Sequence, residues 1–180
     1  MRSKEDKVLE LFFNYPKQWH FEELLEQAQI GRPQLAKWLI AFQKEGIIKR
    51  VKPKGRMPYY VHNFSSLTFR SKKRQFALQT LQKSGLFDHL ARLKNAKVVI
   101  LFGSFAREDW YADSDVDIFI YGKGDEFERG MYESRLGREI QVHNARNNEE
   151  LQKMKKLLPY IIAGNYIKGS LANLGVEICA

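Results

Sequence analysis

Apolar residues recur at helical spacing in three short stretches near the start of the chain. Ser3 precedes the first stretch and is a residue type that caps helices. In the third stretch, Pro33 suits the first turn and Gly46 suits the C-terminal end. The pattern therefore predicts three short helices, within residues 3–15, 20–30 and 31–46. The predicted buried stripe of the third helix consists of Leu35, Trp38, Leu39 and Phe42.

Two strand-like runs, 47–52 and 58–62, follow these helices, and the turn between them, PKGRMP, is basic. Three short helices and a basic β-hairpin resemble a winged helix-turn-helix domain, in which the third helix enters the major groove and the hairpin, or wing, contacts the backbone or minor groove. The resemblance implies binding of DNA, or RNA, by Arg32, Gln34, Lys37 and Lys44 on the helix and by Lys49, Arg50, Lys52, Lys54 and Arg56 on the wing. The alternative is a winged helix that serves protein contact or dimerisation.

A leucine-rich stretch connects this region to the rest of the chain. Its leucines, from Leu78 to Leu90, have near-helical spacing and predict one or two helices that break near Gly85. A basic cluster at residues 70–74 either extends a nucleic-acid-binding surface or is a solvated helix face. The predicted organisation is therefore a winged helix-turn-helix at 1–63, a helical connector at 64–93 and a second domain at 94–180.

Charge changes between the two halves of the chain. Residues 1–62 hold 12 Lys or Arg and 7 Asp or Glu, residues 63–93 hold 6 and 1, and residues 94–180 hold 12 and 13, giving the net charge of +9. A basic first half joined to a near-neutral second half suggests two modules with different partners. Solubility is the other explanation for surplus Lys and Arg.

The second half contains a pair of aspartates in otherwise strand-like sequence. KVVILF is a β-branched and apolar run that predicts a buried strand, and it ends in Gly103 and Ser104, a pairing that suits phosphate. DSDVDIFIY predicts a second strand, in which alternation puts Asp115 and Asp117 on one face. Two carboxylates there repel each other, which raises one pKa unless a divalent ion such as Mg²⁺ binds. The sequence thus predicts a metal site beside a phosphate site, with a solvated aspartate pair as the alternative.

The segment from Gly103 to Asp117 resembles the signature of the DNA polymerase beta-like nucleotidyltransferase superfamily, especially its minimal members. It consists of Gly103-Ser104, a short helix and then Ser114-Asp115-Val116-Asp117. The resemblance covers about residues 95–170. It implies an α+β or α/β fold with a small mixed sheet flanked by helices, a nucleoside triphosphate substrate such as ATP, and Mg²⁺ (or Mn²⁺) held by the two catalytic aspartates. It also implies nucleotide binding by Gly103, Ser104 and Ser114. Arg107 is expected to neutralise phosphate, unless it is an ordinary surface arginine.

The family usually places a third carboxylate on the next strand, which is predicted here from GREIQVHNA. Alternation puts Glu139, Gln141 and His143 on one face, and the apolar pattern places Gln141 where the acid is expected. A neutral amide cannot serve as a carboxylate base for a hydroxyl nucleophile. Glu139 is then the candidate third catalytic carboxylate, and His143 is an alternative base or ligand. A surface charge and a structural histidine are the competing interpretations.

Other features of the chain exclude some classes of protein. No apolar run approaches the roughly 20 residues of a membrane span, and the start of the chain lacks the pattern of a signal peptide. Cys179 is the only cysteine, so it cannot form an internal disulfide and no cysteine framework for zinc exists. A cytoplasmic location is the expectation that follows.

Three functions are compatible with these features. The first is an active nucleotidyltransferase that modifies a protein or nucleic acid and binds nucleic acid through the winged helix. The second is a DNA-binding transcriptional regulator or antitoxin whose degenerate transferase domain senses a nucleotide. The third is an interaction module with neither activity. Small members of the superfamily often act as the antitoxin of a helical toxin, which implies such a partner, and winged helices on palindromic sites are often homodimers.

Overall fold

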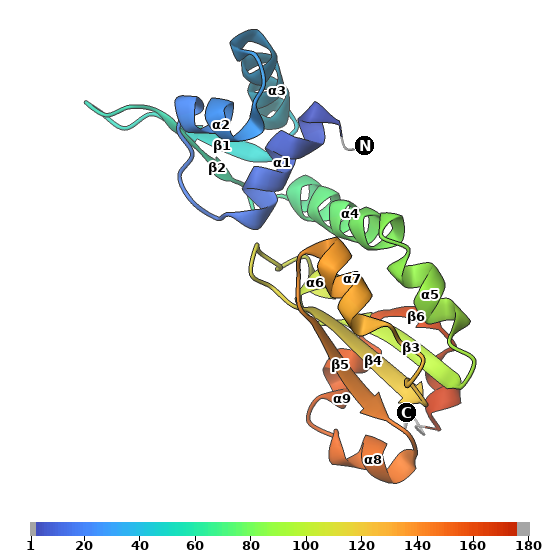
Figure 1. Cartoon of the computed structure of the whole chain (residues 1–180). Helices are drawn as coiled ribbons and strands as arrows, with labels where there is room; N and C mark the ends of the chain where they lie inside the picture. The colour runs from blue at the N-terminus through green and yellow to red at the C-terminus, as the bar shows by residue number, and fades with distance from the viewer. Residues whose placement is uncertain (1–2, 176–180) are drawn as a thin grey trace. The chain divides into compact units, whose positions relative to one another are not determined.

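The computed structural model describes residues 3–175, and the chain divides into two compact units (Figure 1). Unit 1 consists of Met1–Lys73 and Trp110–Ala112, and unit 2 consists of Arg74–Asp109 and Asp113–Ala180. Cys179 lies outside the described residues. Within residues 3–175, none of the helices has the length and apolar character needed to cross a membrane.

Unit 1 begins with three helices and an antiparallel pair of strands. Ser3 caps the first helix, because its hydroxyl accepts a hydrogen bond from the backbone N–H of Asp6 while the Asp6 carboxylate accepts one from the N–H of Ser3. The strands pair from Ile48 with His62 to Val51 with Tyr59. This order of helices and strands is the one that the hydrophobic pattern predicted. The elements are α1 (Lys4–Asn14), α2 (Phe21–Ala28), α3 (Arg32–Lys44), β1 (Ile48–Val51) and β2 (Tyr59–His62).

Aromatic rings fill the core of unit 1, and one of them comes from much later in the chain. Trp110 is 2% exposed, and its ring packs edge-on against Phe13 with 6.3 Å between centroids. The ammonium group of Lys73 lies 4.9 Å from the centre of the Trp110 ring. Trp38, by contrast, was predicted in the buried stripe of the third helix and is only partly buried. Trp110 is therefore part of the unit 1 core, although it lies far from the other core residues in sequence.

A four-stranded mixed sheet forms the centre of unit 2 (Figure 1). Its strands lie in the order β5-β4-β3-β6, with β3 antiparallel to both β4 and β6, and β5 parallel to β4. The strands are β3 (Ala96–Phe102), β4 (Val116–Gly122), β5 (Ile140–Ala145) and β6 (Asn165–Lys168). β3 and β4 are the strands predicted from KVVILF and DSDVDIFIY. Their central place in the sheet explains why both are so apolar, since each is covered on two faces.

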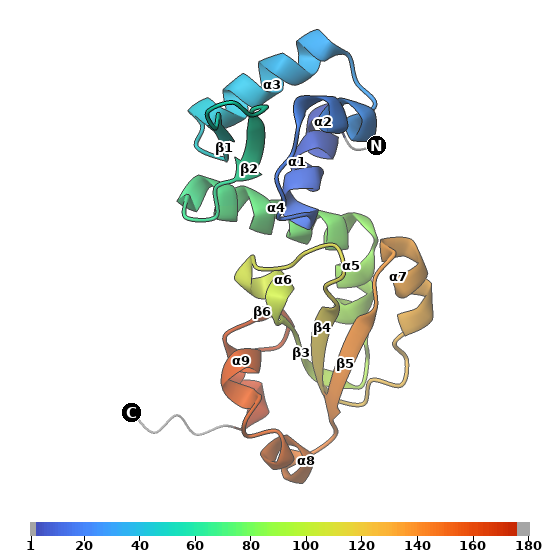
Figure 2. The same cartoon turned by 90° about the vertical axis from the view of Figure 1, so that its left-hand side faces the viewer.

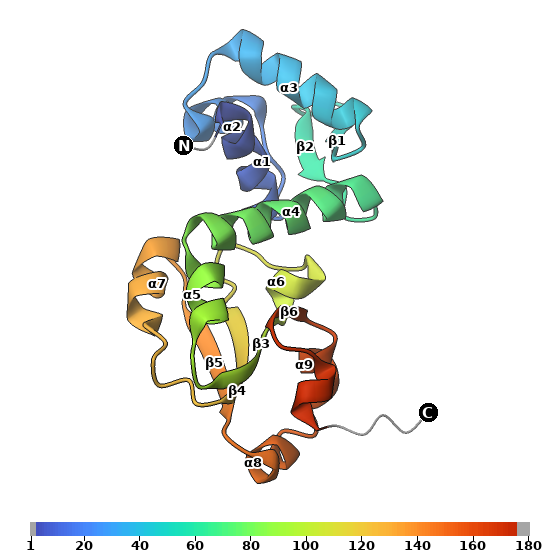
Figure 3. The same cartoon turned by 90° about the vertical axis from the view of Figure 1, so that its right-hand side faces the viewer.

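Helices cover both faces of this sheet (Figures 2 and 3). α5 and α7 lie over one face, α9 lies over the other, and α8 lies beyond the end of β5. An apolar cluster on the second face joins Phe119 and Ala145 of the sheet to Leu151 and Ile161 of the helices. The elements are α4 (Leu67–Lys83), α5 (Leu86–Arg92), α6 (Ser104–Arg107), α7 (Arg129–Leu136), α8 (Asn148–Lys153), α9 (Leu158–Ile162) and the 3-10 helix η1 (Leu171–Leu174).

The region predicted as a helical connector contains α4 and α5. The helices are interrupted at Gly85, which has a φ of 82° and is the N-cap of α5, so the break lies where the sequence predicted it. The boundary between the units falls inside α4, between Lys73 and Arg74.

Candidate active site

The Gly-Ser turn and the second aspartate lie directly against each other at the end of β3. Phe102, the last residue of β3, pairs in register with Asp117 of β4. Gly103 follows with a φ of 71°, a conformation that L-residues rarely adopt, and α6 begins at Ser104. A β-carbon added at Gly103 would overlap the Asp117 carboxylate. Glycine is therefore required here both by the backbone conformation and by the space that the carboxylate occupies.

The electrostatics of the two aspartates agree with the repulsion predicted from their spacing. Asp115 immediately precedes β4, and Asp117 lies within it, with its side chain 22% exposed. Burial raises the pKa of the Asp117 carboxyl above its ordinary value, and the charge of Asp115 raises it further. His143, when it is protonated, and Arg107 act in the opposite direction, because a positive charge nearby favours the ionised carboxylate. Asp117 thus lies in a site that disfavours its negative charge.

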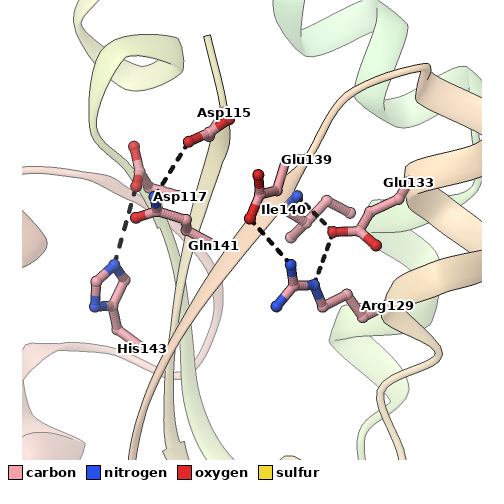
Figure 4. Close-up of polar contacts among 8 residues, drawn as sticks. All are labelled: Asp115, Asp117, Arg129, Glu133, Glu139, Ile140, Gln141 and His143. Carbon is pink, nitrogen blue, oxygen red and sulfur yellow. Dashed lines mark hydrogen bonds and ion pairs between the residues drawn. The ribbon is translucent and has the colours of Figure 1, made fainter.

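β5 brings an amide and an imidazole to the aspartates (Figure 4). Gln141 pairs in register with Asp117, and its Nε2 donates a hydrogen bond to Oδ2 of Asp115 at 3.1 Å. His143 Nε2 lies 4.0 Å from Oδ1 of Asp117, and its ring packs against Phe102 with 5.3 Å between centroids. The register therefore places Gln141 on the strand beside the aspartates, as the apolar pattern indicated. An amide in this place can orient Asp115, but it cannot accept a proton.

Glu139 makes its contacts away from the aspartates. Its carboxylate lies 3.3 Å from Arg129 of α7, which also donates to Glu133 at 2.7 Å (Figure 4). Glu133 in turn accepts the backbone N–H of Ile140 at 2.9 Å, and this bond, with Arg129, lowers the pKa of the Glu133 carboxyl. The Glu139 side chain is 60% exposed. Its role as a third catalytic carboxylate stays a prediction, and the pairing with Arg129 does not favour it.

The other predicted nucleotide-binding residues border the same turn and strand. Arg107 ends α6, and its Nε lies 3.4 Å from Oδ2 of Asp109. Ser114 directly precedes Asp115, and its backbone carbonyl accepts a hydrogen bond from Nη1 of Arg138 at 3.0 Å. Arg138 was missed by the sequence analysis, because it belongs to no motif and its contact depends on how β5 pairs with β4.

The residues predicted to bind a metal ion at this site are the two aspartates. Within residues 3–175, no group of three or more His, Cys, Asp or Glu side chains is arranged to hold a metal ion. A divalent ion would thus need further ligands from water or from a substrate, as Mg²⁺ commonly takes them from phosphates. Binding of Mg²⁺ or Mn²⁺ accordingly stays a prediction.

The predicted nucleic-acid-binding residues of unit 1 are exposed, but they differ in their partners. Arg32 donates two hydrogen bonds to the Glu22 carboxylate, at 2.6 and 2.7 Å, and this pairing raises the pKa of Arg32. Within the described part of the chain, the other cations of the set form no ion pair with an acid. They are Lys37 and Lys44 on α3 and Lys49, Arg50, Lys52, Lys54 and Arg56 on the hairpin, and the neutral Gln34 is exposed with them.

Three cations of the basic cluster at residues 70–74 contact acidic or aromatic side chains of the protein itself. Lys72 lies 3.2 Å from the Glu45 carboxylate, and Lys73 is buried beneath aromatic rings. Arg74 lies 3.5 Å from Glu108. These contacts do not favour an extension of a nucleic-acid-binding surface.

Comparison with known proteins identifies the second half of the chain. A family model described as a nucleotidyltransferase domain matches residues 83–172, which is half of the chain. Searches of curated proteins and of solved structures give no match. The matched residues include the Gly-Ser turn, both aspartates and the whole of β5.

Proposed function

The chain belongs to the family of nucleotidyltransferase domains, and we propose that it transfers a nucleoside monophosphate from a nucleoside triphosphate, such as ATP, to a protein or nucleic-acid acceptor. The observation that carries this proposal is the contact between the Asp117 carboxylate and Gly103. It supports the proposal because one of the two predicted metal ligands lies against the predicted phosphate-binding turn. The same proposal includes a helical, toxin-like protein as a possible acceptor of the nucleotide.

The residues of the site fit a divalent cation. Asp115 and Asp117 would hold Mg²⁺ or Mn²⁺. A cation would offset both their mutual repulsion and the cost of burying the negative charge of Asp117, the two effects that raise its pKa. When bound, the ion polarises the reacting phosphoryl group and stabilises charge on the leaving pyrophosphate. Gln141 keeps Asp115 oriented by donating to its Oδ2.

The turn after β3 would bind the triphosphate. Gly103 has no side chain to keep a phosphate from the backbone, and Ser104 offers a hydroxyl beside it. The positive charge of Arg107 acts on Asp117, so it is near enough to the site to compensate phosphate charge as well. Ser114, directly before Asp115, is the remaining residue predicted to bind the nucleotide.

We also propose that unit 1 binds nucleic acid as a winged helix-turn-helix. The support is the exposed cations of α3 and the hairpin, which lack acidic partners among the described residues. Phosphate neutralisation by such cations drives nucleic-acid binding. Arg32 contributes less to this surface than sequence suggests, since Glu22 already pairs with it.

A second function is favoured by one observation, the position of Gln141. An amide occupies the strand position beside Asp117, and Glu139 is paired with Arg129 instead of with the aspartates. Under this alternative the protein is a DNA-binding regulator or antitoxin that senses a nucleotide without turnover. Binding of triphosphate would then change the affinity for DNA, and no nucleotide would be transferred.

The test is calorimetric titration of the full chain with ATP, with and without Mg²⁺. We expect Mg²⁺-dependent binding that Asp117→Asn abolishes, because the variant removes one of only two predicted metal ligands. Asp125→Asn is the matched control: it removes the same charge from an exposed side chain of unit 2 that pairs with Arg146, and it should bind like the wild type. Failure of the wild type to bind any triphosphate would overturn the proposed function.

A further inference from the structure

Arg138 contacts the first residue of one predicted motif of unit 2 and the residue that follows the other. Its Nη1 donates to the backbone carbonyl of Ser114 at 3.0 Å, and its guanidinium carbon lies 5.3 Å from the centre of the Phe105 ring. Ser114 is the first residue of the motif that holds the two aspartates, and Phe105 directly follows Ser104. A single side chain thus contacts one motif directly and the neighbour of the other.

The pairing of Phe102 with Asp117 fixes the second aspartate beside the turn, but Ser114 and Asp115 precede β4, and the spacer that leads to them does not stay in unit 2. Residues 105–113 separate the motifs, and within them the segment Trp110–Ala112 belongs to unit 1, with Trp110 buried in its core. Packing at the centre of the spacer therefore does not fix its two ends against each other. Holding the ends of a loop together costs conformational entropy, and a contact that joins them offsets part of that cost.

The backbone that carries Arg138 is itself fixed beside β4. The carbonyl of Glu139, the next residue, accepts the N–H of Val116 at 2.9 Å. Ile140 then donates its N–H to the Glu133 carboxylate, also at 2.9 Å. Since Val116 lies between the two aspartates in sequence, the base of the Arg138 side chain is tied to the strand whose end it holds.

We propose that Arg138 is a positioning residue for the nucleotide site, which holds the Gly-Ser turn and the strand of the two aspartates at the separation that binding of a metal–triphosphate complex requires. This inference rests on the proposed function of the same site. Arg138 acts through Phe105 and Ser114. Its loss therefore weakens binding of Mg²⁺–ATP, which engages both motifs, more than it weakens binding of ATP without metal.

The chain offers a closely matched control in Arg135. That side chain also donates to a backbone carbonyl, of Ser84 at 3.1 Å, and its guanidinium carbon also lies 5.3 Å from an aromatic ring, that of Tyr132. Its contacts lie away from the motifs. Arg135→Ala thus removes the same kinds of interaction in the same unit. It measures how much their loss changes nucleotide affinity and amide exchange when the motifs are not contacted.

The first experiment is calorimetric titration of full-length wild type, Arg138→Ala, Arg138→Lys and Arg135→Ala with ATP, with and without Mg²⁺. We expect Arg138→Ala to lower the affinity for Mg²⁺–ATP about tenfold, the lower end of the effect of residues that support metal ligands. Arg135→Ala should stay close to the wild type. Arg138→Lys should recover part of the affinity, because lysine keeps a donor and a charge but lacks the planar group.

The second experiment needs no ligand. Hydrogen exchange of backbone amides in residues 104–107 and 115–117 should be faster in Arg138→Ala than in Arg135→Ala. Equal affinities and equal exchange in these two variants would overturn the role of Arg138 while leaving the proposed function intact. Wild-type protein that binds no triphosphate would overturn both. If Arg138→Ala does not fold, Arg138→Lys carries the same comparison, and wild-type affinity and exchange in it would overturn the role of the guanidinium group over the Phe105 ring.

Discussion

The two units gather like charges in opposite ways. In unit 1, cations such as Lys54 and Arg56 are exposed, so water solvates them and their repulsion is weak. In unit 2, Asp115 and Asp117 lie together beside a buried strand, and the pKa of Asp117 is raised by burial and by its neighbour. The basic surface thus carries little electrostatic cost without a ligand, whereas the acidic pair carries a cost that a bound cation would reduce.

The change expected to have the largest effect is Gly103→Ala. The alanine would adopt a strained positive φ and place its β-carbon in the Asp117 carboxylate. We expect binding of Mg²⁺–ATP to be lost and the free energy of unfolding to fall by about 1–3 kcal/mol from the strained backbone alone. Calorimetric titration and denaturant unfolding measure the two effects.

Gly130→Ala is the control for this substitution. Gly130 lies in α7, and a β-carbon there meets nothing within 4 Å. Because alanine favours helices, the control should gain up to about 1 kcal/mol and bind nucleotide normally. Wild-type binding by Gly103→Ala would contradict the close packing of turn and aspartate as a requirement of the site.

The next largest effect is expected for the exposed cations of the hairpin in unit 1. Lys54→Ala combined with Arg56→Ala should weaken binding to duplex DNA and reduce the slope of log affinity against log salt by about 1.8, or 0.9 per lost phosphate contact. Fluorescence anisotropy over a salt series measures both. Arg32→Ala should change the slope less, because Glu22 pairs with Arg32 in the free protein. An unchanged slope in the double variant would exclude the hairpin from the interface.

The smallest expected effect is a pH dependence of stability that arises from Asp117 in unit 2. Since burial and Asp115 raise the pKa of Asp117, the folded protein binds this proton more tightly than the unfolded chain does. Stability from this group is therefore present at low pH and is lost as pH rises from the ordinary value of 3.8 through the raised pKa. Asp117→Asn should raise the Tm of the metal-free protein at neutral pH, and the gain should shrink as pH falls toward 3.8. Thermal unfolding across that range would contradict this if the difference in Tm did not depend on pH.

Local signals in the sequence were sufficient for the elements of unit 1, for α4 and α5 and for the strands β3, β4 and β5. Ser3 forms the predicted cap, and Gly46 has the positive φ of a helix end. The apolar pattern of GREIQVHNA placed Gln141 correctly, because strand alternation fixes which residue meets Asp117 once the neighbouring strand is known. Such signals depend on residues close together in sequence, and these are the features that one chain alone can reveal.

Features that depend on distant residues could not be predicted. Alternation placed Glu139 on the face of Gln141, but β5 begins at Ile140, so the rule does not hold for a residue before the strand. Its carboxylate then pairs with Arg129 on α7, a contact set by tertiary packing. The burial of Trp110 in unit 1 has the same origin, because the spacer between the two motifs carries no signal that its centre belongs elsewhere.

That burial has a consequence for how the protein can be divided. The chain passes from one unit to the other after Lys73, after Asp109 and after Ala112, so a single cut does not separate them. A fragment ending at Lys73 would lack the indole against which Phe13 packs, and a fragment starting at Arg74 would carry that indole without its surroundings. Each piece made alone would expose a large aromatic surface and invite aggregation or proteolysis. Genetic recombination at the apparent domain border would produce the same incomplete pieces, so the two halves are expected to be inherited together.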